Sequence, residues 1–279
     1  MITPSLIFRR IFPAVALTAA LLSVAACATD KVPTPDEIKQ DNADNRARQL
    51  LRVGDASRAG GDSASALAFY QRAQAMRPDW DAPYRRTGET ALALGMAAEA
   101  AEAYTRLTAL APDDPAALLG LGRALVALDR PDEAADAFTR AHEAAPQDHR
   151  ALNGLGVARD LAGDHAGAQR FYRQGLALAP DSLSLKNNLG LSLALSGKFA
   201  DAIQTLGDAA KAPGAGPRAR QNLALVYGLS GDMDRAAKIG RLDLSESQVR
   251  SNLKRYETLR KLSDKARARA VHTGQGPDG

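Results

Sequence analysis

Small and apolar residues recur along most of the chain at one fixed interval. Four series share this phase. They are Gly54, Gly88, Gly122, Gly156 and Gly190; Ala66, Ala100, Ala134, Ala168, Ala202 and Ala236; Gly61, Gly95, Gly163, Gly197 and Gly231, with Asp129 at the missing step; and Pro78, Pro112, Pro146 and Pro180. A period of about 34 residues predicts stacked supersecondary units. We place them at 47–80, 81–114, 115–148, 149–182, 183–216 and 217–250.

Each series has a physical role in a helix-turn-helix unit. Glycine or alanine where two helices touch lets their backbones approach closely, and the aromatic residue that follows fills the gap to the next unit. The second glycine series suits the left-handed residue that ends a first helix, and the prolines stop the second helix. The predicted aromatic residues are Tyr70, Tyr104, Phe138 and Tyr172.

This spacing resembles the tetratricopeptide repeat (TPR), and the resemblance implies an all-α superhelix of about six repeats over 46–244. The last two units depart from the pattern. Gly214 stands in place of proline, Leu206 in place of the aromatic residue and Ala224 in place of glycine. We therefore expect the second helix of the sixth unit to be short.

A further amphipathic helix is predicted at 245–265. Ser245 and Gln248 form a capping-box start, and apolar residues follow at helical spacing. Because the last repeat of a stack exposes an apolar face, we expect this helix to cover it. The remaining residues, 266–279, are expected to be a disordered tail.

The N-terminus carries an export signal. Arg9 and Arg10 precede an apolar stretch that ends in small residues before Cys27. The sequence VAAC resembles the lipobox of bacterial lipoproteins, which implies a signal peptide over 1–26, cleavage before Cys27 and a covalent lipid on its thiol. An ordinary secretory signal or an uncleaved anchor is the alternative.

The segment 27–45 mixes proline with charged and amide residues and lacks an apolar period, so we expect a flexible tether. Ala28, in place of an aspartate after the cysteine, resembles the outer-membrane sorting signal of enteric lipoproteins. The expected location is the periplasmic side of the outer membrane, with the inner membrane as the alternative.

Composition argues against several classes of function. With 36 Lys and Arg against 32 Asp and Glu, the chain has little excess charge for binding nucleic acid. Its four histidines and one cysteine lack zinc-ligand spacing. The glycine motifs at 154–160 and 163–167 fall on repeat glycines, and there is no GxSxG motif. We therefore expect no catalytic residues, no metal and no small-molecule cofactor or substrate.

Partner recognition is expected on the concave surface, which the first helix of each TPR lines. Amide side chains there pair with peptide backbone, and arginine takes a carboxylate. Mere solvation of these side chains is the alternative. The predicted groove positions are Arg85, Glu89, Arg123, Asn153, Val157, Asn187, Leu191, Gln221 and Leu225.

The C-terminal stretch DLSESQVRSNLKRYETLR at 243–260, together with the lipoprotein layout, is similar to the TadD-like assembly proteins of Tad/Flp pili. The resemblance implies a scaffold that aids assembly of the pilus export machinery at the outer membrane, with the secretin as the first candidate partner. The alternatives are a periplasmic TPR adaptor for outer-membrane protein assembly, a type IV pilus pilotin, or an adaptor for cell-wall enzymes.

Overall fold

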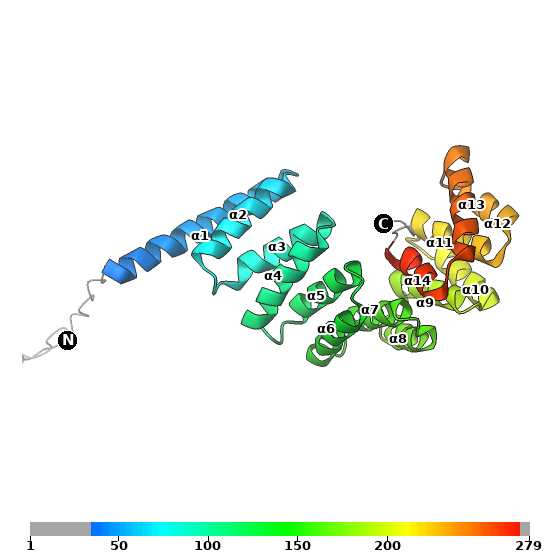
Figure 1. Cartoon of the computed structure of the whole chain (residues 1–279), viewed down its shortest axis with the longest axis horizontal. Coiled ribbons are helices and arrows are strands. Elements are labelled where there is room, and N and C mark those ends of the chain that lie inside the picture. The colour runs from blue at the N-terminus through cyan, green and yellow to red at the C-terminus, as the bar shows by residue number, and fades with distance from the viewer. Residues whose placement is uncertain (1–34, 274–279) are drawn as a thin grey trace, which may run out of the picture.

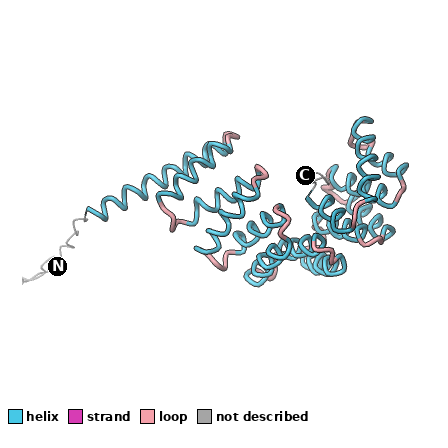
Figure 2. The backbone as a smooth tube through the Cα atoms, in the orientation of Figure 1, coloured by secondary structure: helices cyan, strands magenta, loops and turns pink. Residues whose placement is uncertain are grey.

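The computed structural model describes residues 35–273, and these form 14 helices without a strand. Six successive helix pairs stack into a curved superhelix, which two further helices close (Figures 1 and 2). The first helices of the pairs are α1 (Pro35–Ala59), α3 (Asp81–Ala93), α5 (Pro115–Ala127), α7 (His149–Leu161), α9 (Leu183–Leu195) and α11 (Pro217–Ser230). Their partners are α2 (Ser63–Met76), α4 (Ala97–Leu110), α6 (Pro131–Ala144), α8 (His165–Leu178), α10 (Phe199–Lys211) and α12 (Met233–Gly240). The all-α superhelix predicted from the repeat period is confirmed.

The turns inside the pairs are built as the second glycine series predicts. The residue at this step has a positive φ in all six pairs: Gly61, Gly95, Asp129, Gly163, Gly197 and Gly231. Asp129, with φ 56°, is the only non-glycine residue of the described chain in this conformation. Helix starts are set by side-chain caps, such as Asp114 on the Ala116 and Ala117 amides, and by Pro115, Pro131 and Pro217 in the first turn.

The predicted packing of rings against glycines is also present. A Cβ on Gly88 would lie 2.7 Å from ring carbons of Tyr104, and one on Gly120 in the next pair would lie 2.2 Å from the same ring. Phe138 lies in the same way between Gly122 and Gly154. Each ring therefore joins its own repeat to the next one.

The end of the stack is closed by α13 (Glu246–Lys261) and α14 (Asp264–Thr273). Helix α13 begins with the predicted capping box of Ser245 and Gln248. Its Tyr256 packs on Gly228 of α11, where a Cβ would lie 2.3 Å from the ring. As expected, α12 is short, with 8 residues. Helix α13 thus covers the side of α11 that a further repeat would otherwise cover.

Two expectations about the ends of the chain differ from the structure. Residues 35–45, expected to be part of a flexible tether, belong to α1. No proline or glycine interrupts the chain between Pro35 and Gly54, and Asp44 forms an ion pair with Arg77 after α2, at 2.5 Å between Oδ1 and Nη1. The helix lacks an apolar period here because it extends beyond the stack.

The tail predicted as disordered from residue 266 is helical up to Thr273, within α14. This helix folds back toward α7 and α9 on the inner side of the curve (Figure 1). The signal peptide, Cys27 and residues 274–279 lie outside the described residues. Within 35–273, no helix is both long and apolar enough to cross a membrane.

Candidate functional site

The inner face of the superhelix is lined by the first helices of the pairs, which also contact one another from α3 to α11. The predicted groove residues recur on these helices at one or two repeat periods. Asn153 lies on α7, Asn187 on α9 and Gln221 on α11. Because the repeats stack in register, equivalent positions form a row across the concave surface.

Amide side chains pair across this row. The Asn188 Nδ2 donates to Asn153 Oδ1 at 2.9 Å, and the Asn222 Nδ2 donates to Asn187 Oδ1 at 3.4 Å. Sequence reasoning did not single out Asn188 and Asn222, although they too are separated by one repeat period. A side-chain amide offers two donors and two acceptor lone pairs, so each of these asparagines has capacity beyond its one mutual bond.

A pocket of about 370 Å³ with several polar side chains in its lining opens beside this row. It brings together two of the predicted residues, Asn153 and Asn187, with Arg218, which is exposed at the start of α11. The complete lining is Asn153, Leu183, Ser184, Asn187, Asn188, Gly216, Arg218 and Ala219. This lining can hydrogen-bond a polypeptide backbone through its amides and pair with a carboxylate through Arg218.

The predicted charged residues of the N-terminal repeats are engaged within the chain. Arg85 pairs with Asp114 at 2.6 Å and thereby joins α3 to the start of α5, while Glu89 pairs with Arg58 of α1 at 3.2 Å. Burial acts to raise the pKa of Asp114, but the hydrogen bond and charge of Arg85 and the Ala116 and Ala117 amides together outweigh it, so the net pKa lies below the ordinary value. Both ion pairs connect neighbouring repeats.

The other predicted positions differ in exposure. Arg123 is exposed, whereas Asn187 and Leu191 are buried, at 8% and 6% exposure. Val157 and Leu225 are half-buried and pack against the hydrophobic cluster that contains Leu191. Only part of the predicted set is therefore open to a partner, and its role in binding remains a prediction.

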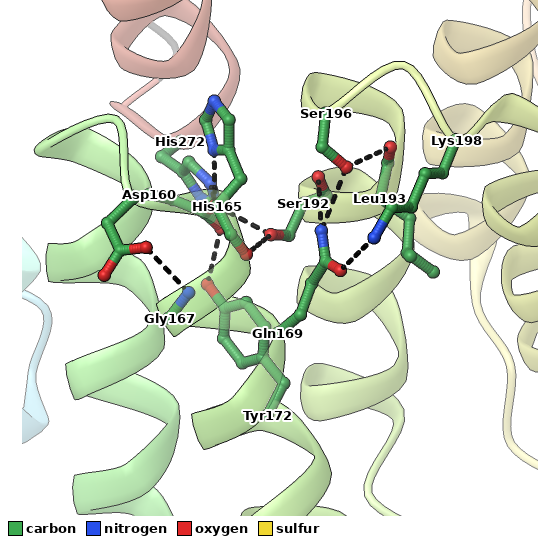
Figure 3. Close-up of polar contacts among 11 residues, drawn as sticks. Asp160, His165, Gly167, Gln169, Tyr172, Ser192, Leu193, Ser196, Lys198 and His272 are labelled. Atoms are coloured by element: carbon green, nitrogen blue, oxygen red, sulfur yellow. Dashed lines mark hydrogen bonds and ion pairs between the residues drawn. The ribbon is translucent and has the colours of Figure 1, made fainter.

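Sequence reasoning missed a buried polar cluster at the C-terminal end of α7. Asp160 is fully buried and accepts four hydrogen bonds, from His165, Tyr172, Ser192 and His272, whose side chains Figure 3 shows gathered together. Its Oδ1 accepts from His165 Nδ1 at 2.8 Å and from Ser192 Oγ at 2.7 Å. Its Oδ2 accepts from Tyr172 Oη at 3.0 Å and from His272 Nε2 at 3.1 Å. The His165 side chain is mostly buried, with 11% exposure.

The electrostatics of this cluster follow from its donors. Burial acts to raise the pKa of Asp160, but the hydrogen bonds from His165, His272 and Ser192 and the charge of His272 together outweigh it, so the pKa lies below its ordinary value. Burial and the nearby Asp160 charge raise the pKa of Tyr172 well above its usual range. The carboxylate is therefore ionised, saturated with donors and closed to solvent, which suits a structural role.

A repeat alignment of the sequence holds the signal for this cluster. The positions equivalent to Asp160 are apolar in three other repeats, as Leu92, Val126 and Ala194. A carboxylate at an otherwise apolar step requires partners, because a buried charge without them is costly. The repeat period does not reveal the contact between Asp160 and His272, because the two residues lie 112 positions apart.

Comparison with protein families identifies the chain. The tetratricopeptide-repeat family model matches residues 85–149, 119–183 and 187–245, which together cover more than half of the sequence. The chain belongs to the tetratricopeptide-repeat family. Proteins of this family are protein-interaction scaffolds, typically without enzymatic activity. A search of curated proteins gives no match.

Solved TPR structures share this fold at low sequence identity. A tetratricopeptide repeat protein from Parabacteroides merdae is 17% identical, with a TM-score of 0.66 over 80% of this chain and 89% of that one. Pseudomonas aeruginosa pilF is also 17% identical, with a TM-score of 0.57 over 79% of this chain and 99% of that chain. PilW, described as a widely conserved type IV pilus biogenesis factor, is 17% identical, with a TM-score of 0.59 over 78% of this chain and 96% of that chain.

Proposed function

We propose that this TPR protein is a non-enzymatic, lipid-anchored scaffold that holds a protein partner in its concave groove during assembly of the Tad/Flp pilus export machinery. The observation that carries the proposal is the pocket beside the asparagine row, which Asn153, Asn187 and Arg218 all line. Amides without a complete set of partners and an exposed guanidinium suit a peptide segment with a carboxylate. The first candidate for that partner is the secretin.

Envelope attachment is supported by the sequence of the N-terminus. A charged start, an apolar stretch and the VAAC sequence support lipidation at Cys27, and Ala28 supports retention at the outer membrane. Two or more acyl chains, at about 0.8 kcal/mol per buried methylene, make such an anchor stable. Replacing Cys27 by serine is expected to move the protein to the soluble fraction or to leave an uncleaved precursor. Membrane fractionation of a cleaved Cys27→Ser protein would contradict lipid anchoring.

The pilus role is supported by the C-terminal stretch at 243–260, which resembles the TadD-like proteins and forms α13 with its capping box. A type IV pilus pilotin is the second candidate, because the fold aligns with 99% of pilF and 96% of PilW. Both candidates place the protein at the assembly of a pilus pore. They differ in which kind of pilus a strain without the gene would fail to assemble.

Deletion of the gene tests the pilus assignment. We expect a deletion strain to make prepilin normally but to lack Tad/Flp pili and to restore them when the wild-type gene is supplied. Loss of type IV pili alone would favour the pilotin role. Normal pili of both kinds would contradict both candidates and favour a general envelope adaptor.

Photo-crosslinking in cells tests the groove. A photoreactive amino acid at Arg218 lies in the pocket, whereas the same residue at Gln204 lies exposed on α10, on the other side of the repeat. We expect a crosslinked envelope partner from position 218 and none from position 204. Crosslinks from position 204 alone would contradict the groove while leaving a scaffold role intact.

A further inference from the structure

The C-terminal helix α14 packs within the inner curve of the protein, against α7 and α9 (Figure 1). Its alanines provide the contact surface, with Ala268 and Ala270 almost fully buried. Ala270 and the half-buried Val271 join the hydrophobic cluster that also contains Leu191 and Val157, two of the predicted groove residues. Part of the groove surface is therefore covered by the chain itself.

Polar contacts connect α14 to three other parts of the chain. Arg269 forms an ion pair with Asp129 at the end of α5, with 3.2 Å between Nη1 and Oδ2. His272 donates to Asp160 in the buried cluster (Figure 3), and Arg255 of α13 donates to the carbonyl oxygen of Ala270 at 3.3 Å. The helix is thus held by an ion pair and hydrogen bonds as well as by apolar contact.

Both acidic partners of α14 are departures from the repeat pattern. Asp129 occupies the left-handed turn position that is glycine in the other five pairs, and a non-glycine residue is strained there. Asp160 occupies a step that is apolar in three other repeats. The two residues come from different repeats, yet each contacts a cation or donor of the same short helix. The ion pair with Arg269 gives Asp129 a partner on α14, and His272 adds a donor from α14 to the three that Asp160 accepts from α8 and α9.

We propose that α14 is an intramolecular ligand of the concave face, which binds reversibly beside α7 and α9 and competes with protein partners for that part of the groove. This inference rests on the proposed function, since it concerns the regulation of the same groove. So short a helix is marginal on its own, and Leu262 and Ser263 separate it from α13. Its Arg267 also donates to the carbonyl oxygens of Leu259 and Leu262 beside this connection, at 3.1 and 2.8 Å. The surface beneath it accepts a short basic helix with an alanine face.

Competition between α14 and a peptide copy of itself tests the proposal. The probe is a fluorescently labelled peptide of residues 262–273, added to the full-length protein. In the wild-type chain the attached helix acts at an effective concentration in the millimolar range, so the peptide is expected to bind weakly. In an Arg269→Ala/His272→Ala chain the attached helix is weakened, and we expect the wild-type peptide to bind at least about tenfold more tightly.

Two matched variants show whether the peptide binds in the place of α14. Lys265 is exposed on the same helix and forms no ion pair with another described residue. The Lys265→Ala chain also loses one positive charge, but it should bind the peptide as weakly as the wild type does. Adding Asp129→Asn to the double variant removes the partner of Arg269 and should abolish the tighter binding. Circular dichroism melting checks that each chain is folded. If the double variant does not fold, the single variant Arg269→Ala replaces it, because the Arg269 side chain is half-exposed.

The result that overturns the proposal is equal peptide binding by the wild-type and double-variant chains, or tight binding that survives Asp129→Asn. The assay requires no envelope partner, so its outcome is independent of the pilus assignment. Pocket crosslinks in cells that are equally strong for wild type and Arg269→Ala would also contradict competition by α14 while leaving the scaffold role intact. Stronger crosslinks for Arg269→Ala would support it.

Discussion

The first three helix pairs and the last three share one repeat plan but are joined in different ways. In the N-terminal half, ion pairs at partly exposed side chains connect the repeats, as in Arg58 to Glu89 and Arg85 to Asp114. In the C-terminal half, a fully buried carboxylate, Asp160, connects α7, α8, α9 and α14 through four donors. Helices α13 and α14 then close that end.

This difference indicates how a repeat protein can stabilise one end of its stack. Each repeat of a solenoid contacts only its neighbours, so an unmodified stack gains stability step by step. The buried cluster and the returning helix add contacts between segments 112 residues apart, such as that between His272 and Asp160. We therefore expect α7 to α11 to open as one body, whereas the N-terminal repeats depend on nearest-neighbour packing.

The largest expected effect comes from removing the buried carboxylate. Asp160→Ala leaves Tyr172, Ser192 and two imidazoles without their acceptor, and we expect a loss of about 3–5 kcal/mol in the free energy of unfolding. Asp208→Ala removes an exposed carboxylate from α10 and should change stability by less than about 0.5 kcal/mol. Chemical denaturation of both variants measures the difference. Equal stability would show that the cluster does not hold the C-terminal half together.

A somewhat smaller effect is expected from filling a contact between helices. A Cβ on Gly190 would lie 2.5 Å from Leu206, whereas one on Gly207 in the same repeat meets nothing within 4 Å. Gly190→Val should therefore destabilise the protein by about 1–3 kcal/mol through overpacking, and Gly207→Val should leave the packing unchanged. If the two variants melt at the same temperature, the assigned register of the repeats is wrong.

The repeat part of this fold could be predicted from the sequence because its determinants are periodic. A glycine at a contact, a ring in the gap and a left-handed residue in the turn each recur at the same step, and even the exception at Asp129 keeps the positive φ. The row of Asn153 and Asn187 followed from the same period. Its hydrogen-bond partners, Asn188 and Asn222, required the structure because they sit one position off the predicted row.

The ends of the chain could not be predicted in the same way. Helix α14 contains few large apolar residues, and its place depends on Asp129 and Asp160, which are distant in sequence. The start of α1 has a polar composition typical of a tether, yet it continues a helix nucleated by the first repeat. Both segments take their structure from a neighbour rather than from their own pattern.

A pH titration sharpens the comparison further. The pKa of Asp160 is lower in the folded chain than its ordinary value, so its stabilising effect is complete above the unfolded pKa of about 4. That effect is lost as the pH falls through the lower pKa of the folded state. We expect the melting temperature of the wild type to fall more steeply below about pH 4 than that of Asp160→Asn. Parallel curves would contradict an ionised Asp160.

The smallest effect is expected at the ion pairs of the N-terminal half. Arg58 and Glu89 are each more than one-third exposed, so Arg58→Ala should cost less than about 1 kcal/mol, and the cost should shrink in high salt. Arg72→Ala, at an exposed position of α2, is the matched control and should be close to neutral. A loss as large as that of Asp160→Ala would remove the distinction between the two halves.

Amide hydrogen exchange on the full-length protein tests the central claim most directly, because it reports the opening of each helix separately. We expect α7, α9 and α11 to exchange slowest and together, α14 to open before them, and the start of α1 to exchange fastest. Protection in α1 to α4 equal to that in α7 to α11 would contradict the claim that the buried cluster makes α7 to α11 open as a single body.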